Sequence, residues 1–297
     1  MRVLRNLFLY ISLLAAALHV QAQDETSRGT SIGLIGGPLS YQGDLQPNSF
    51  SFQQSRFYAG IYVRQPIFDR FSVKAGLNSG SLYAGDKNNR DYLKIRNLSF
   101  YTKIQEGFLT LDYELLSLTQ RHFTPFAYGG LAYFHFNPYT FDTVGTKVYL
   151  QPLGTEGQGL SRYPDRKPYQ LSQLAIAFGG GIRILVSDVF LINLEIGQRK
   201  TFTDYLDDVS KSYADRDALL AARGPKAVEL AFRSNELPNG GAYPHEGEQR
   251  GTPTNKDWYY MAGLSVEIKL RAITKMGAGK YFGKRDVYNM RCPKVRL

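Results

Sequence analysis

Apolar and polar residues alternate with a period of two along several segments of the chain. The longest such segment spans 260–270, where one face carries Tyr260, Ala262, Leu264, Val266, Ile268 and Leu270. The opposite face carries Met261, Gly263, Ser265, Glu267 and Lys269. Because successive side chains of a β-strand point to opposite faces, this pattern predicts a strand with one apolar face.

The same alternation recurs elsewhere in the chain, clearly at 71–78 and 190–199 and more weakly at 30–40, 57–65, 108–116, 126–136 and 174–183. After residue 22 no stretch has the nearly continuous run of about 20 apolar residues that a transmembrane helix needs. A chain of this kind can span a membrane only as a closed barrel. We therefore predict an all-β fold, a transmembrane outer-membrane β-barrel of about eight antiparallel strands.

The connections between these segments alternate in length. Three are short, at 66–70, 118–124 and 185–189, and three are long, at 85–107, 137–170 and 201–257. Outer-membrane barrels have short periplasmic turns and long extracellular loops. With an even number of strands, both termini are expected in the periplasm, including a short C-terminal tail.

A soluble β-sandwich or a lipocalin-like barrel would also alternate, with its apolar face turned into a core. The polar faces favour the membrane barrel, because they carry many charged residues of both signs. In a narrow eight-stranded lumen these residues can pair with one another. The predicted lumen charge network comprises Arg64, Lys74, Asp112, Glu114, Arg183, Glu195, Arg199, Glu267 and Lys269.

The N-terminus has the features of a secretory signal peptide. Arg2 and Arg5 precede an apolar run at 7–18, and the small residue Ala22 suits cleavage ahead of Gln23. The run is too short to span a bilayer as a helix, and no cysteine follows it, which argues against a lipoprotein. The predicted organisation is a signal peptide at 1–22, an outer-membrane barrel at 23–270 and a basic periplasmic tail at 271–297.

The formal net charge of +10 is concentrated in this tail. Its basic residues, set against Asp286 alone, are Arg271, Lys275, Lys280, Lys284, Arg285, Arg291, Lys294 and Arg296. Since the barrel region is then close to neutral, we expect no nucleic-acid binding. Cys292 is the only cysteine, so the chain forms no internal disulfide and no multi-cysteine metal site. Its thiol either stays reduced or pairs with another chain.

Few residues suit acid–base catalysis. His19 leaves with the signal peptide, His122 falls in a predicted periplasmic turn, and His135 lies near an outer strand end. A Ser/His/Asp site would require these distant positions to meet. We therefore predict a protein that is not an enzyme, with no cofactor and no catalytic or metal-binding residues.

Two features of the loops resemble binding motifs. The glycine-rich segment 154–159 looks like a phosphate-binding loop, but the Lys-Ser/Thr pair that should follow is absent, so we expect it to fold onto the barrel rim. The carboxylates of Asp204, Asp207 and Asp208 could bind Ca²⁺, or could accept hydrogen bonds from the loop backbone, Arg199 or Lys200.

Aromatic residues flank the predicted strand ends, at Tyr133, Phe134, Phe136, Tyr139, Trp258, Tyr259 and Tyr260. Trp and Tyr are enriched where a membrane protein meets the lipid headgroups. These residues are therefore predicted to form an aromatic girdle rather than a ligand site.

Longer motifs carry a family resemblance. Three of them lie in predicted loops, at 150–160 (LQPLGTEGQGL), at 199–210 (RKTFTDYLDDVS) and within 250–259 (RG…NKDWY). Two more lie beside predicted strands, RNLSF at 96–100 and TPFAY at 124–128. With these motifs the chain resembles the PorG family, the outer-membrane barrel component of the type IX secretion system of Bacteroidetes, over roughly residues 30–270.

The resemblance implies a barrel joined at its periplasmic side to a ring built from the lipoprotein PorK and from PorN. The machine exports proteins and supports gliding motility in some members. The family has no established catalytic residues to transfer. The tail at 271–297 lies outside the matched part, so a contact between its basic residues and the ring is our own inference from charge.

The first functional hypothesis is therefore a non-enzymatic anchor for the periplasmic ring. Its expected partners are outer-membrane lipids and PorK/PorN-like proteins, with no small-molecule substrate. A small pore or ligand channel is the alternative, although inward charges of both signs argue against an open lumen. A surface enzyme is a third possibility, with His135 and Asp204 as its best candidate residues.

Overall fold

Eight long strands close into a barrel in the computed structural model, which describes residues 29–48, 51, 53–118 and 121–270. The strands are β1 (Ser31–Gln42), β2 (Arg56–Pro66), β3 (Phe71–Gly85), β4 (Ser99–Glu114), β5 (Phe123–His135), β8 (Ser172–Leu185), β9 (Phe190–Thr201) and β10 (Trp258–Lys269). All neighbours pair antiparallel, and the first barrel strand, β1, pairs with the last, β10. The predicted fold, a closed eight-stranded barrel of the outer-membrane type, is confirmed.

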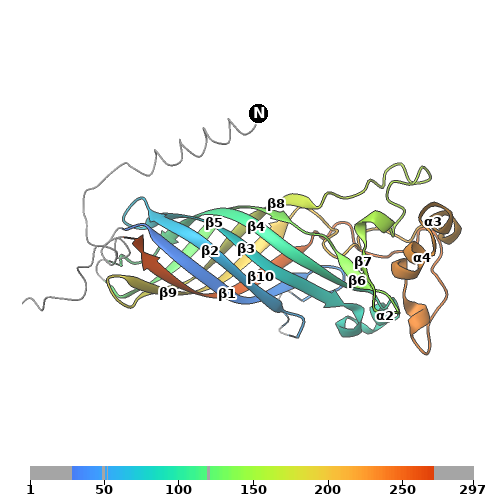
Figure 1. Ribbon diagram of the computed structural model, residues 1–297, viewed down its shortest axis with the longest axis horizontal. Helices are drawn as coiled ribbons and strands as arrows, with labels where there is room; N and C mark the ends of the chain where they lie inside the picture. Colours follow the sequence, from blue (N-terminus) through green and yellow to red (C-terminus); the bar gives the residue numbers. More distant parts are fainter. Residues whose placement is uncertain (1–28, 49–50, 52, 119–120, 271–297) are drawn as a thin grey trace, which may run out of the picture.

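The two ends of the barrel differ in the length of their connections (Figure 1). At one end three short segments join the strands, and Ser31 of β1 pairs there with Lys269 of β10. At the other end long loops span 86–98, 136–171 and 202–257. The signal peptide predicted at 1–22 and the tail predicted at 271–297 lie outside the described residues.

The outer face of the barrel carries a belt of exposed apolar side chains. Every barrel strand contributes to it, with Leu34, Ile61, Leu77, Leu109, Leu131, Ile182, Leu194 and Leu264 each between 46% and 65% exposed. A soluble barrel would turn such residues into its core. A continuous apolar outer surface is the arrangement of strands that face lipid.

The kind of residue that points inward changes along the strands, as β4 shows. Near the long loops Phe100 and Ile104 point inward and are almost fully buried, whereas Lys103 points outward and is exposed. Farther along the same strand Leu109 points outward and Asp112 inward. The strands therefore continue beyond the lipid belt as a water-surrounded barrel with an apolar core. The predicted start of this strand at 108, and the long connection predicted at 85–107, were wrong because the apolar face changes side.

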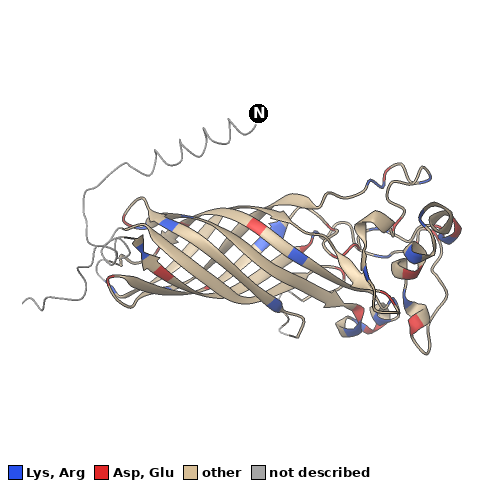
Figure 2. Cartoon of the chain, viewed as in Figure 1, with Lys and Arg blue, Asp and Glu red and all other residues tan. Residues whose placement is uncertain are grey.

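The long loops contain short elements of their own. The sheet is extended by β6 (Tyr139–Phe141) and β7 (Lys147–Tyr149), and the helices are α2 (Asp91–Lys94), α3 (Arg216–Arg223) and α4 (Pro225–Ala231). Three 3₁₀ turns complete them, η1 (Asp86–Asn88), η2 (Gln151–Leu153) and η3 (Ser234–Glu236). Figure 2 shows that many charged residues gather in this loop region. Among the described helices, none has the length and apolar character required to cross a bilayer.

Candidate functional site: a filled lumen and a folded loop cap

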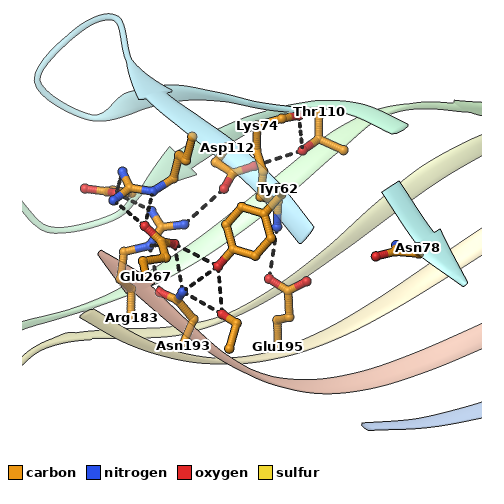
Figure 3. A network of polar contacts seen from close by, with 12 residues as sticks. Tyr62, Lys74, Asn78, Thr110, Asp112, Arg183, Asn193, Glu195 and Glu267 are labelled. Atoms are coloured by element: carbon orange, nitrogen blue, oxygen red, sulfur yellow. Dashed lines mark hydrogen bonds and ion pairs between the residues drawn. The ribbon is translucent and has the colours of Figure 1, made fainter. Parts of the chain in front are cut away.

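Buried charges fill the lumen within the lipid belt (Figure 3). Arg183 is 1% exposed and lies between two carboxylates, 3.1 Å from Asp112 Oδ2 and hydrogen-bonded to Glu114. Its Nε donates to Asn193 Oδ1 at 2.9 Å. Arg64 pairs with Glu267 at 2.9 Å. These groups come from strands all around the barrel, so the network ties opposite walls together.

A second group of buried charges lies farther along the lumen toward the loops. Lys74 Nζ is 3.0 Å from Glu195 Oε2 and 4.6 Å from the ring centroid of Tyr128. Arg199 donates to Glu106 at 2.8 Å. The cavity between these side chains holds only about 10 Å³, at or below the volume that a single water molecule needs. Here the lumen is packed rather than open.

The predicted lumen residues can now be placed. Eight of them point inward and take part in the ion pairs above: Arg64, Lys74, Asp112, Glu114, Arg183, Glu195, Arg199 and Glu267. Lys269 is half-buried at the short-turn opening and forms no ion pair with a described residue. Sequence reasoning missed Glu106, because the predicted strand began two residues after it. The eight tail residues that were predicted to contact a partner, from Arg271 to Arg296, lie outside the described part of the chain.

The three loop motifs of the family resemblance meet above the barrel in a cluster that we call the loop cap, formed by 150–160, 199–210 and 250–259. Glu156, fully buried, is at its centre. Its carboxylate accepts hydrogen bonds from the backbone N–H groups of Ser210 at 2.9 Å and Lys211 at 3.0 Å, and from Arg250 Nη1 at 3.0 Å. The motif residues therefore stabilise one another within a single folded unit.

The glycine-rich segment 154–159 packs within this unit, as expected. Gly157 has a φ of 79°, and a Cβ atom there would lie 2.4 Å from the ring of Tyr163. This left-handed backbone favours glycine, and any larger residue would place its Cβ against the ring. The segment thus forms a compact turn on the rim and not a phosphate-binding loop ahead of a helix.

The aspartates of 204–208 are bound mainly by loop groups. Asp208 accepts hydrogen bonds from Thr155 Oγ1 at 2.5 Å and Tyr169 Oη at 2.7 Å, and Asp207 accepts one from the Val209 N–H at 2.9 Å. The expected bond from Arg199 is not formed, because Arg199 points into the lumen and pairs with Glu106. Of the two alternatives, hydrogen bonding to the loop describes Asp207 and Asp208.

Asp204 differs from its neighbours. It is 3% exposed, and neither of its carboxylate oxygens has a hydrogen-bond partner. The nearby Ser210 hydroxyl lowers the pKa of Asp204, but burial outweighs this effect. Burial, together with the nearby charge of Asp44, raises the pKa of Asp204 from 3.8 to about 7. Burial also raises the pKa of Asp208, to about 6.

These pKa values predict that the loop cap is more stable in weak acid than at pH 8. A carboxyl whose folded-state pKa is raised binds a proton more readily in the folded cap, so stability increases as the pH falls toward 5. Trp258, the only tryptophan, lies at the base of the cap and can report its urea unfolding by fluorescence. Asp204→Asn should raise cap stability at pH 8 by about 1–2 kcal/mol and flatten the pH dependence.

Asp165→Asn is the matched control, because the Asp165 side chain is 77% exposed. It should change neither the stability of the loop cap at pH 8 nor its pH dependence. Equal pH dependence in wild type and Asp204→Asn would contradict the role given to Asp204.

The predicted aromatic girdle is only partly correct. Tyr133 is 59% exposed on the outer face, and Trp258 and Tyr260 also point outward. Phe134, Phe136 and Tyr259 are instead buried in the apolar core of the upper barrel, in contact with one another. The residues alternate along each strand, so at most every second one can face lipid.

No group of His, Cys, Asp or Glu side chains within the described ranges has an arrangement suited to a metal ion. His135 is exposed on the outer face, where Nδ1 lies 2.9 Å from Ser172 Oγ. Asp204 is buried within the cap, so the two candidate residues for a surface enzyme occupy different environments.

Comparison with solved structures finds small barrels of outer-membrane proteins. The N-terminal barrel domain of Pseudomonas aeruginosa OprF is 11% identical, with a TM-score of 0.33, over 80% of this chain and 96% of that one. Neisserial surface protein A is 7% identical (TM-score 0.39; 81% and 97% covered). Pseudomonas aeruginosa OprG is 11% identical (TM-score 0.37; 83% and 99% covered).

A search of curated proteins finds no match. A family of domains, by contrast, matches in sequence over residues 5–221, which include seven of the barrel strands and the first two motifs of the loop cap. The chain belongs to this family, which is described as a domain of unknown function, DUF6089.

Proposed function

We propose that this protein resides in the outer membrane and is a non-enzymatic component of the type IX secretion machinery, where it anchors the periplasmic ring of PorK/PorN-like proteins. The apolar belt supports a membrane location, since it surrounds the barrel on every strand. The resemblance of the loop motifs to the PorG family supports the assignment to that machinery. These motifs are also the residues that hold the loop cap together.

The filled lumen is the observation that carries the proposal. Ion pairs occupy the interior within the belt, and the cavity between them has room for about one water molecule at most. A barrel with such an interior has no path for a solute, so its function depends on its surfaces and its two ends. This also argues against the alternative, a small pore.

The end with the short connections is the one assigned to the ring. β10 ends at Lys269 on this side, and the basic tail at 271–297 follows directly. If this end faces the periplasm, then the chain enters its basic tail on the side of the ring. Charge complementarity speeds docking and gives it specificity.

Deletion of 271–297 tests the role of the tail. In cells that also express the ring proteins, we expect the barrel to co-purify with the ring and the deletion variant to lose most of this recovery. A second variant in which the eight Lys and Arg residues of the tail are changed to Gln separates charge from length. We expect it to lose recovery as the deletion does.

The experiment tests the role of the tail and the anchor function separately. Undiminished recovery of both variants would remove the tail from the docking surface and leave the anchor function to the barrel. Absence of the ring proteins from the wild-type purification, with the barrel folded and inserted, would contradict the anchor function itself.

A further inference from the structure

A cavity of about 630 Å³ opens on the outside of the barrel, beneath the long loops. Three of its walls are the segments 42–47, 89–93 and 252–256, and the remaining wall is the outer face of the barrel. Lys200 and Trp258 form the barrel wall. They are directly paired across β9 and β10, and both point away from the lumen.

The cavity lies just above the lipid belt. On β9 the exposed apolar residue Ile196 is four residues from Lys200, or about 13 Å along the strand. Phe178 and Tyr260 lie between these two levels, where both pair with Gln198. Their rings contact that of Trp258, with centroids 6.0 Å and 6.3 Å away. Trp and Tyr side chains mark the interface between hydrocarbon and headgroups. The cavity is therefore at the level of the headgroups of the lipid layer nearest the long loops.

Three cations that line this cavity form no ion pair with a described residue: Arg90, Lys200 and Lys256. Arg90 contacts the Tyr92 hydroxyl at 3.4 Å, Lys256 donates to the Pro253 carbonyl at 2.8 Å, and Lys200 lies 5.7 Å from the centre of the Trp258 ring. By contrast, the arginines buried inside the barrel each pair with a carboxylate.

The other polar groups around the cavity are mainly uncharged. Thr252, Thr254 and Asn255 line it with hydroxyl and amide groups, and the indole of Trp258 forms part of its wall. Gln42 and Asn89 also line it, but their amides already bond within the chain, to the Pro47 carbonyl at 3.1 Å and the Asp44 carbonyl at 3.0 Å. Among the described lining residues Asp44 is the one acid, and its Oδ2 already accepts the Thr252 N–H at 2.9 Å. The lining therefore offers positive charge for an anionic group and hydrogen bonds for hydroxyl groups.

We propose that this cavity binds the phosphorylated sugar headgroup of a glycolipid, of the lipopolysaccharide class, in the outer leaflet. The phosphates contact Arg90, Lys200 and Lys256, the sugar packs beside Trp258, and the acyl chains extend along the apolar belt. The assignment depends on the orientation of the barrel in the membrane and is independent of any contact with the periplasmic ring.

Fluorescence of Trp258 measures this binding directly in the purified full-length protein, because the chain has no other tryptophan. In detergent micelles, lipopolysaccharide should change the emission saturably. The variant Arg90→Gln/Lys200→Gln/Lys256→Gln should bind about 100-fold more weakly. The matched control, Lys103→Gln/Lys167→Gln/Arg216→Gln, removes three exposed cations outside the cavity and should bind as wild type does.

Two further probes identify the source of the anion. Dephosphorylated lipopolysaccharide should lose most of the affinity, and inorganic phosphate or the soluble phosphorylated oligosaccharide should compete only at much higher concentration. Equal binding of the phosphorylated and dephosphorylated forms, or wild-type affinity of the cavity variant, would overturn the proposal. Competition by inorganic phosphate at the same concentration as the glycolipid would overturn the assignment to a lipid.

Discussion

Replacing Arg183 with Gln is expected to destabilise the barrel by about 3–5 kcal/mol. Arg183 is 1% exposed and is the shared partner of Asp112 and Glu114, both buried. Without the guanidinium these two carboxylates remain in the lumen with like charge and lose their strongest hydrogen-bond donor. Urea unfolding of the protein in lipid vesicles, followed by far-UV circular dichroism, measures the loss.

Compensating changes separate the ion pairs from simple packing. Arg183→Gln combined with Asp112→Asn and Glu114→Gln should recover much of the lost stability, because no unpaired charge remains. The exposed Lys103→Gln is the control and should change stability by less than about 0.5 kcal/mol. Wild-type stability of Arg183→Gln alone would show that water or ions already compensate the carboxylates, and that the lumen is open.

Replacing Arg250 with Gln should open the loop cap and leave the barrel intact. Arg250 is 3% exposed and connects the three motifs through Glu156 Oε1 at 3.0 Å, the Asp208 carbonyl at 2.5 Å and the Ala231 carbonyl at 3.2 Å. The substitution leaves the Glu156 carboxylate buried without its cation, which costs about 3–5 kcal/mol of cap stability. Hydrogen exchange at 150–160 and 201–257 should then become much faster, with no change in the barrel strands.

The chain offers a matched control in Arg162→Gln. Arg162 also pairs with a glutamate, Glu246 at 2.5 Å, but the two side chains are 52% and 37% exposed. An exposed pair contributes at most about 1 kcal/mol, so this variant should exchange nearly as wild type does. Equal exchange in the two variants would mean that the motif residues do not hold the cap together.

The part of the fold that could be predicted from the sequence is the part within the lipid belt. There the environment reverses the soluble pattern, with apolar residues outside and charged residues inside, and strands such as β9 and β10 alternate clearly. Above the belt the environments change: water surrounds the barrel and the lumen holds an apolar core. A search for strands with an apolar outer face and a polar inner face stops at this boundary. The sequence therefore predicts a loop for the first nine residues of β4.

The same boundary explains what was found and what was missed in the site. Most charged residues of the lumen were predictable because they interrupt apolar strands at every second position. Glu106 lies at the change of polarity and was not recognised. The loop cap was not predictable in detail, because Glu156 and Arg250 are 94 residues apart in sequence and meet only through tertiary folding.

Electrical recording of the purified protein in planar lipid bilayers tests the central claim most directly, namely that the barrel is filled and works through its ends and outer surface. The packed lumen predicts insertion without channels, so current should stay at the level of the protein-free bilayer. An open-channel conductance that recurs in wild-type protein, and that changes with substitution of the lumen residues Lys74 and Glu195, would contradict the account and favour a pore.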